Sequence, residues 1–139
     1  PTASRFFFLG ETLMPVRGIR GANYVKQDDP ETILSATRQL LVAILDANPR
    51  LLTEDIASVL FTLTPDLRST HPAQAARQLG WNQVPLICAQ EISTPTSLER
   101  CIRVLVHWNT DLPQDAIRHV YLGKASCLRP DLNLKEDRP

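Results

Sequence analysis

Two segments in the second half of the chain have the residue pattern of β-strands. Residues 84–91 are a mostly apolar run that ends in Glu91, and residues 101–108 alternate between two faces. One face of the second segment carries isoleucine, valine and tryptophan, whereas the other carries Arg103. An arginine in an apolar strand is costly to bury unless it meets an anion. Glu91 and Cys88 on a neighbouring strand would be polar neighbours of Arg103. We therefore expect these residues to form a pocket for a small anionic molecule.

The remaining pattern predicts two helices and three more strands. Apolar residues recur at helical spacing over residues 30–47, after an acidic cap at Asp29 and with proline in the first turn. A shorter helix is predicted over residues 72–79, where Gln74 and Arg77 are spaced so that they share a face. The strands are predicted at residues 16–25, 56–64 and 118–122, and a short helical turn at residues 125–130.

This order of elements predicts an α+β fold, in which a mixed β-sheet has helices on one face. A single domain is predicted over residues 15–132, with an N-terminal extension at residues 1–14 and a polar C-terminal tail at residues 133–139. Two helices cover one face, so the other face is expected to expose Leu105, Trp108 or their neighbours. Packing against other copies of the chain would bury that face, which predicts a homo-oligomer.

Composition and charge exclude several classes of partner. The 15 basic and 15 acidic side chains give no net charge, whereas nucleic-acid-binding domains carry a basic excess. No apolar segment approaches the ~20 residues that span a membrane. The three cysteines form no Cys-x-x-Cys pair, so a zinc site has no support and the thiols are expected to be free. Because free thiols fit a reducing compartment and residues 5–9 are too short for a signal-peptide core, we expect a cytoplasmic protein.

Arginine chemistry points to an anionic ligand. Arginines outnumber lysines by 12 to 3, and arginine suits two-pronged recognition of carboxylate or phosphate, although a GC-rich genome would give the same ratio. Arg20 lies between Gly18 and Gly21, which allow a ligand or another element to approach closely; a bulge with a surface arginine is the alternative interpretation. Cys88 is either a buried small apolar residue or a nucleophile. The three histidines occur in separate contexts, which favours structural or solvated roles over a catalytic triad.

Six segments carry a resemblance to one known family: VRGIRGA at 16–22, TPDL at 64–67, VPLICAQE at 84–91, CIRV at 101–104, RHVYL at 118–122 and LRPDL at 128–132. They resemble the AroH-type bacterial chorismate mutases, which are monofunctional and trimeric. The similarity runs from about residue 16 to residue 132, with the segments in the same order and at matching spacing. Several motifs in one order are far more specific than any one of them alone.

The resemblance implies both an assembly and a reaction. It implies a homotrimer whose three sheets form a pseudo-α/β barrel, with active sites in the clefts between subunits. The implied reaction converts chorismate to prephenate, on the branch of the shikimate pathway that leads to phenylalanine and tyrosine. This Claisen rearrangement occurs within one molecule and needs no cofactor, metal or covalent intermediate.

The chemistry of this rearrangement explains the residues that the resemblance assigns to catalysis. As the ether C–O bond of chorismate breaks, negative charge builds on the ether oxygen, where a fixed cation stabilises the transition state more than the ground state. The resemblance gives this role to Arg103, which also holds a substrate carboxylate. It assigns Glu91 to accept a hydrogen bond from the substrate hydroxyl, and places Cys88 near that hydroxyl and the ring. Holding the substrate in its compact conformer is the other contribution.

Further residues are implied to bind the substrate. Arg20 corresponds to a second carboxylate-binding arginine, and Tyr121 to a phenol that reaches a carboxylate. Leu128 and the tail after it are expected to form a lid. Arg77 corresponds to an arginine at the mouth of the cleft, contributed by the neighbouring subunit.

The chain departs from the family pattern at the mouth of the cleft. His71 and Gln74 stand where family members can have an apolar aromatic residue and a lysine, and the spacing from Arg77 to Trp81 is one residue shorter than in some relatives. Losing the lysine is expected to weaken capture of the carboxylate more than the chemical step.

Two other hypotheses remain at the level of sequence. A trimeric binding module could use the same arginines to hold a carboxylate metabolite, in which case the ligand would stabilise the fold and be recovered unchanged. A cysteine-dependent enzyme would instead use Cys88, and Cys88→Ser would then abolish activity.

Overall fold

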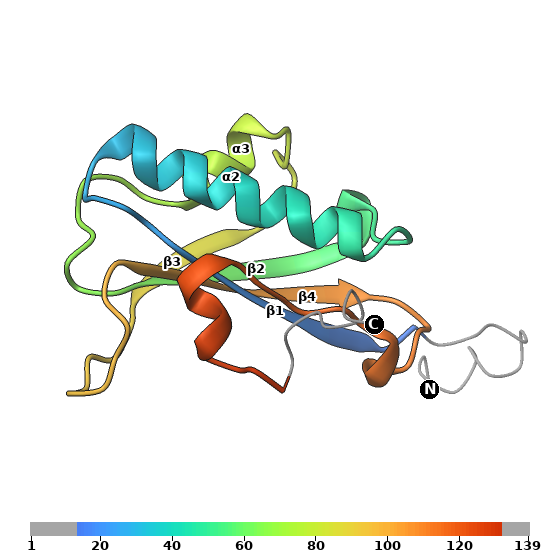
Figure 1. The fold of residues 1–139 in the computed structure, drawn as a ribbon. Coiled ribbons are helices and arrows are strands. Elements are labelled where there is room, and N and C mark those ends of the chain that lie inside the picture. The colour runs from blue at the N-terminus through green and yellow to red at the C-terminus, as the bar shows by residue number, and fades with distance from the viewer. Residues whose placement is uncertain (1–13, 132–139) are drawn as a thin grey trace, which may run out of the picture.

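One five-stranded sheet and two helices make up residues 14–131, the part of the chain that the computed structural model describes (Figure 1). Residues 1–13 of the predicted extension (1–14) and the predicted tail at residues 133–139 lie outside the described residues. Within residues 14–131, no helix is both long and apolar enough to cross a membrane. The elements are β1 (Val16–Tyr24), α2 (Pro30–Ala47), β2 (Ile56–Leu63), α3 (Ala73–Gln78), β3 (Leu86–Gln90), β4 (Cys101–Asn109) and β5 (Val120–Tyr121), with 3-10 turns at Thr53–Asp55, Gln114–Ala116 and Gly123–Cys127.

The bounds of the elements follow the local sequence signals closely. Helix α2 has the predicted bounds, because the Asp29 side chain accepts a hydrogen bond from the backbone N–H of Thr32 at 3.0 Å and Pro30 occupies the first turn. Helix α3 is one residue shorter than predicted at each end. Strands β3 and β5 cover only the middle of the predicted segments 84–91 and 118–122. The predicted helical turn at residues 125–130 is the 3-10 turn Gly123–Cys127, which begins two residues earlier.

Strand β4 is the centre of the sheet, whose order is β3-β2-β4-β1-β5. It is antiparallel to β1 and β2, whereas β3 is parallel to β2 and β5 is parallel to β1. The predicted mixed sheet of an α+β fold is therefore confirmed. Arg103 of β4 lies opposite Ala22 of β1 on one side and Thr62 of β2 on the other. The expectation that the strands of Glu91 and Arg103 are neighbours was wrong, because β2 lies between them.

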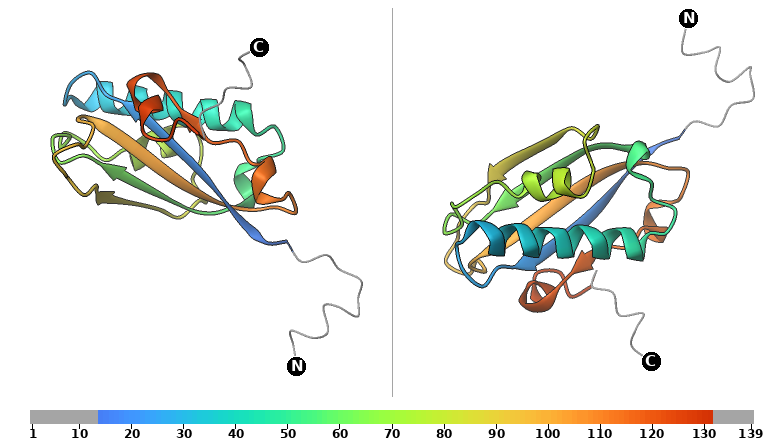
Figure 2. Two further views of the ribbon diagram at one scale, coloured as in Figure 1. Left: turned by 60° about the horizontal axis from the view of Figure 1, so that its bottom comes forward. Right: turned by 90° about the horizontal axis from the view of Figure 1, so that it is seen from above.

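Both helices pack on one face of the sheet, as Figure 2 shows from above. The β4 side chains on this face form the core against α2, and Trp108 is only 1% exposed. The expectation that Trp108 lies on the uncovered face was wrong, because strand alternation places it with the isoleucine and valines of β4 beneath the helices. Leu105 does lie on the uncovered face, which is the face of the sheet away from α2 and α3.

Helix α2 packs closely over Gly21 of β1. A Cβ atom built on Gly21 would lie 3.0 Å from the Val120 carbonyl oxygen and 3.1 Å from the Cδ1 atoms of both Leu40 and Ile44. The close approach predicted beside Arg20 therefore involves a helix of the same chain. Gly18 differs, because its Cβ would meet only Leu105 Cδ1, at an ordinary contact distance of 3.5 Å.

Gly21→Ala is expected to lower the free energy of unfolding by about 1–3 kcal/mol, the typical cost of overpacking a filled core. The reason is that the Val120 carbonyl belongs to the backbone and cannot rotate away as a side chain can. Urea unfolding followed by circular dichroism measures the change. Gly18→Ala on the same strand is the matched control and is expected to be close to wild type. Equal stability of the two variants would contradict this account of Gly21.

Candidate functional site

Four polar side chains gather on the uncovered face of the sheet. Strand alternation points Arg20 of β1, Thr62 of β2 and Arg103 of β4 away from the helices, and Glu91 follows the last residue of β3. With apolar side chains that include Leu60, they line a cavity of about 390 Å³. The structure thus brings together three of the four predicted catalytic residues, namely Arg20, Glu91 and Arg103.

The guanidinium of Arg103 is the unusual group in this cavity. Its Nε atom is buried and has no hydrogen-bond partner. Among residues 14–131 it is the one buried side-chain nitrogen or oxygen atom in this position. The Nε atom lies 3.8 Å from Oε1 of Glu91, too far for a hydrogen bond. A buried charged donor that lacks a partner is costly, and an anionic ligand would supply the missing acceptor. The geometry is therefore suited to an anion in the cavity.

Two hydrogen bonds hold Glu91 at the edge of the cavity. Its backbone N–H donates to the Leu63 carbonyl at 2.7 Å. Its Oε1 accepts a hydrogen bond from the Thr62 hydroxyl at 2.5 Å. The carboxylate is an acceptor only, so its remaining lone pairs suit a hydroxyl donor on a ligand. Thr62 was not among the predicted site residues, because only the pairing of β2 with β4 reveals that it faces Arg103.

The ring of His119 is hydrogen-bonded to the backbone of Arg20. The backbone N–H of Arg20 donates to Nδ1 of His119 at 2.9 Å, so the neutral ring carries its proton on Nε2. Burial lowers the pKa of His119 from the ordinary 6.5, and the charges of Arg20 and Arg129 act in the same direction. Of the two roles left open for this histidine, structural or solvated, the hydrogen bond to the backbone of Arg20 is structural.

Stability is expected to depend on pH through His119. Its pKa in the folded state lies below the ordinary value of 6.5, so between these two pH values the unfolded chain binds more protons and stability rises with pH. This contribution is fully present above pH 6.5 and is lost as the pH falls through the folded-state pKa. Calorimetric Tm measured from pH 7.5 downward tests it. His119→Asn keeps an acceptor near the Nδ1 position without titrating, and an unchanged pH dependence in that variant would contradict the assignment.

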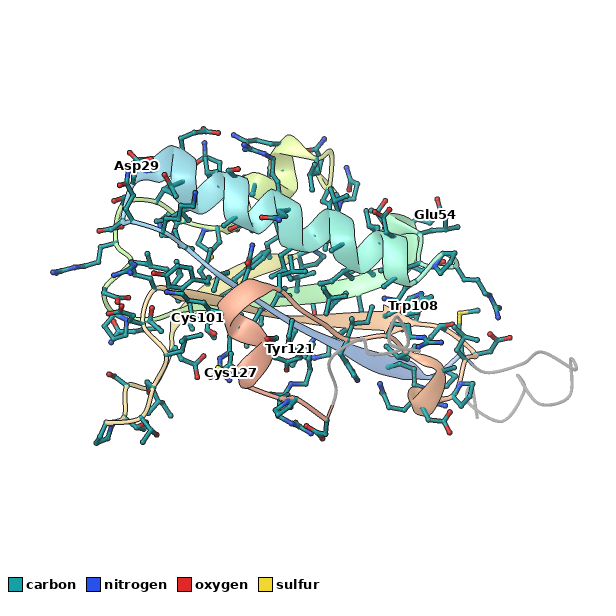
Figure 3. The ribbon with its side chains drawn as sticks, viewed as in Figure 1. Asp29, Glu54, Cys101, Trp108, Tyr121 and Cys127 are labelled. Carbon is teal, nitrogen blue, oxygen red and sulfur yellow. The ribbon has the colours of Figure 1, made fainter. Side chains whose placement is uncertain are left out.

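Tyr121 and Leu128 lie beside the cavity on the same face. Tyr121 and Cys101 lie on the side of the sheet opposite α2 (Figure 3). They form a buried cluster with Ala22, and Leu128 packs against this cluster. Burial raises the pKa of the Tyr121 phenol, against the lowering effect of Arg20, Arg129 and Arg103. The phenol is therefore protonated near neutral pH and can donate a hydrogen bond.

The other predicted residues lie on the opposite side of β3. Cys88 packs toward the helices and lines a separate cavity of about 220 Å³ together with His71. Gln74 and Arg77 share the exposed face of α3, as predicted. The positive charge of Arg77 favours a lower pKa of the Cys88 thiol. The expectation that Cys88 is a polar neighbour of Arg103 within one chain was wrong. Cys88 and Glu91 are an odd number of residues apart, so their side chains point to opposite faces of the sheet.

The environment of Cys88 is that of a packed thiol. Burial raises the pKa of Cys88, with a hydrogen bond to the backbone of Ala73 and the charge of Arg77 acting in the opposite direction. A nucleophilic cysteine needs a lowered pKa so that thiolate is present near neutral pH. The direction of the shift therefore argues against the cysteine-dependent hypothesis.

Comparison with known proteins shows which family the chain belongs to. Residues 16–132 match the sequence profile of the family described as chorismate mutase type I. The chain belongs to this family. The resemblance to AroH-type chorismate mutases, drawn from the motifs, is thereby confirmed.

Two curated relatives and one solved structure match most of the chain. It is 57% identical over 117 residues to the chorismate mutase AroH of Thermus thermophilus, spanning 84% of this chain and 96% of the relative. It is 48% identical over 125 residues to AroH of Bacillus subtilis strain 168, spanning 89% and 98%. The solved structure of a chorismate mutase from Clostridium thermocellum superposes with a TM-score of 0.76 at 44% identity, covering 79% of this chain and 97% of that one.

Proposed function

We propose that the protein is a chorismate mutase, an isomerase that rearranges chorismate to prephenate on the route to phenylalanine and tyrosine. The observation that carries the proposal is the buried Nε of Arg103, which has no hydrogen-bond partner and faces a cavity suited to an anion. Chorismate carries two carboxylates and a hydroxyl, and the cavity offers cations and a carboxylate that match them. Every bond is made or broken within the substrate, so the proposal assigns no cofactor or metal.

Arg103 is assigned to the developing charge. Electron density accumulates on the ether oxygen as its C–O bond breaks, and a guanidinium already in place stabilises that charge without reorganisation. Position 103 is suited to this because β4 is held by strands on both sides, which fixes the backbone of the residue. Arg103 also contacts one of the substrate carboxylates in this proposal.

The other residues of the uncovered face are assigned to orientation. Glu91 accepts a hydrogen bond from the substrate hydroxyl, while Arg20 and the protonated phenol of Tyr121 hold a carboxylate. Leu128, which contacts the cluster around Tyr121, covers the ligand as part of a lid. Together these contacts hold chorismate in its compact conformer, in which the reacting carbons are close.

The assembly proposed here is a homotrimer with each active site between two subunits. Arg77, Gln74 and Cys88 lie on the opposite side of β3 from Arg103 in one chain, so a neighbouring subunit would have to supply them to the cavity. Ile87 and Ile92 are 65% and 79% exposed, and subunit packing would bury such apolar side chains. Three sheets brought together in this way form the pseudo-α/β barrel. Gln74 and His71 at the cleft mouth give weaker carboxylate capture than a lysine would.

The free thiols of Cys88, Cys101 and Cys127 support a reducing compartment, and we place the enzyme in the cytoplasm on that ground.

The proposal is tested by adding chorismate to the purified protein and following the loss of its ultraviolet diene absorbance. Prephenate is identified by its conversion to phenylpyruvate in acid. Enzyme-dependent loss with stoichiometric prephenate is the expected result. Chorismate that binds, raises Tm and is recovered unchanged would reject the enzyme and favour the binding module instead.

A further inference from the structure

Thr62 occupies the position between the two charged groups of the cavity. Strand β2 separates β3 from β4, and Thr62 is paired in register with Arg103. Its side chain lines the same cavity, and its hydroxyl donates to Oε1 of Glu91 at 2.5 Å. The same Oε1 atom is the one that lies 3.8 Å from Nε of Arg103. One carboxylate oxygen thus faces both a hydroxyl and a guanidinium, and it bonds to the hydroxyl.

The separation of Arg103 and Glu91 is unusual for opposite charges on adjacent side chains. A guanidinium and a carboxylate that are free to approach form charge-assisted hydrogen bonds at about 2.7–2.9 Å. Here the Nε atom of Arg103 forms an ion pair with Glu91 at 3.8 Å but has no hydrogen-bond partner. The hydroxyl of a β-branched residue on a doubly paired strand has little freedom to move, so it fixes the position of the oxygen that it binds.

We propose that Thr62 is a positioning residue that keeps the carboxylate of Glu91 from closing onto Arg103. The hydroxyl holds Oε1 at the rim of the cavity, so the Nε–H of Arg103 remains available to the substrate. This inference rests on the proposed chorismate mutase function, because availability of that donor matters when charge develops on the ether oxygen. Thr62 acts through Glu91 and has no assigned contact with the substrate.

The distinguishing variant is Thr62→Val, which keeps the branched shape and removes the hydroxyl. The released carboxylate is expected to pair with Arg103, so that kcat falls about 10- to 100-fold, in line with loss of one hydrogen bond to a charged group. The loss is expected mainly in kcat, because the blocked donor acts in the transition state. Thr62→Ser restores the donor and is expected to recover most of kcat.

A matched control is available on the same strand. Ser58 lies on the same face of β2, and its hydroxyl bonds to Nδ1 of His107 at 3.0 Å. Ser58 and His107 do not line the cavity. Ser58→Ala therefore removes a hydroxyl from the uncovered face without touching Glu91, and wild-type kcat is expected. Loss of kcat in this control equal to that in Thr62→Val would overturn the inference, because any lost hydroxyl would then have the same effect.

A crystal structure of Thr62→Val tests the geometry independently of turnover. The distance from Arg103 Nε to the nearer Glu91 oxygen is expected to shorten from 3.8 Å to hydrogen-bonding range. An unchanged distance, or a variant that differs from wild type only in KM, overturns the inference. If the wild-type protein does not convert chorismate, the proposed function fails instead, and the kinetic and structural measurements separate the two failures.

Discussion

Arg103→Ala is expected to reduce kcat for chorismate by about 10²- to 10³-fold, the typical effect of removing one preorganised charge, which corresponds to ~3–4 kcal/mol. The variant loses the cation that faces the developing negative charge, while the paired backbone of β4 remains in place. Removing a buried donor that lacks a partner also removes a cost to folding, so Tm is not expected to fall in proportion to activity. Steady-state kinetics by diene absorbance and calorimetry measure the two effects.

Arg103→Lys separates charge from geometry. Lysine keeps the positive charge but lacks the planar fork that contacts an ether oxygen and a carboxylate together, so most of kcat is expected to be lost as well. Arg50→Ala serves as a control, because Arg50 forms an exposed ion pair with Asp111 and its side chain is 63% exposed. Wild-type turnover in Arg103→Ala would show that the assignment of this residue is wrong.

Mixed trimers of Arg103→Ala and Arg77→Ala are expected to regain activity that each variant lacks by itself. In the proposed assembly, Arg103 and Arg77 of one site come from different subunits. Each mixed trimer then contains one site with both arginines intact, so trimers purified through two different tags should show about one third of wild-type activity. The measurement is turnover at subsaturating chorismate by the doubly purified protein.

A second mixture controls for recovery by any other route. Nε of Arg103 and Oε1 of Glu91 lie 3.8 Å apart in the same chain. One subunit therefore supplies both residues to a site. Mixed trimers of Arg103→Ala and Glu91→Ala therefore contain no intact site and are expected to show no recovery. Recovery in this control, or none with Arg77→Ala despite a stable trimer, would contradict active sites shared between subunits.

The sequence by itself determined the elements of this fold and the character of its ligand. Helix α2 has the predicted bounds because the Asp29 cap and Pro30 act within one turn of the chain. The alternation along β4 placed Arg103 opposite the apolar core side chains, since side-chain direction in a strand depends only on residue parity. The motifs around Arg103 and Arg20 also indicated the family, because their order and spacing are properties of the chain.

Only the tertiary structure decided which side chains meet. Strand order is a long-range property, and β2 enters between β3 and β4, so Oε1 of Glu91 is hydrogen-bonded to Thr62 and lies 3.8 Å from Nε of Arg103. The helix layer decided that Trp108 is buried, and it placed Cys88 on the side away from Arg103. Local patterns cannot supply such pairings, because the free energy that selects them comes from burying one face of the whole sheet under α2 and α3.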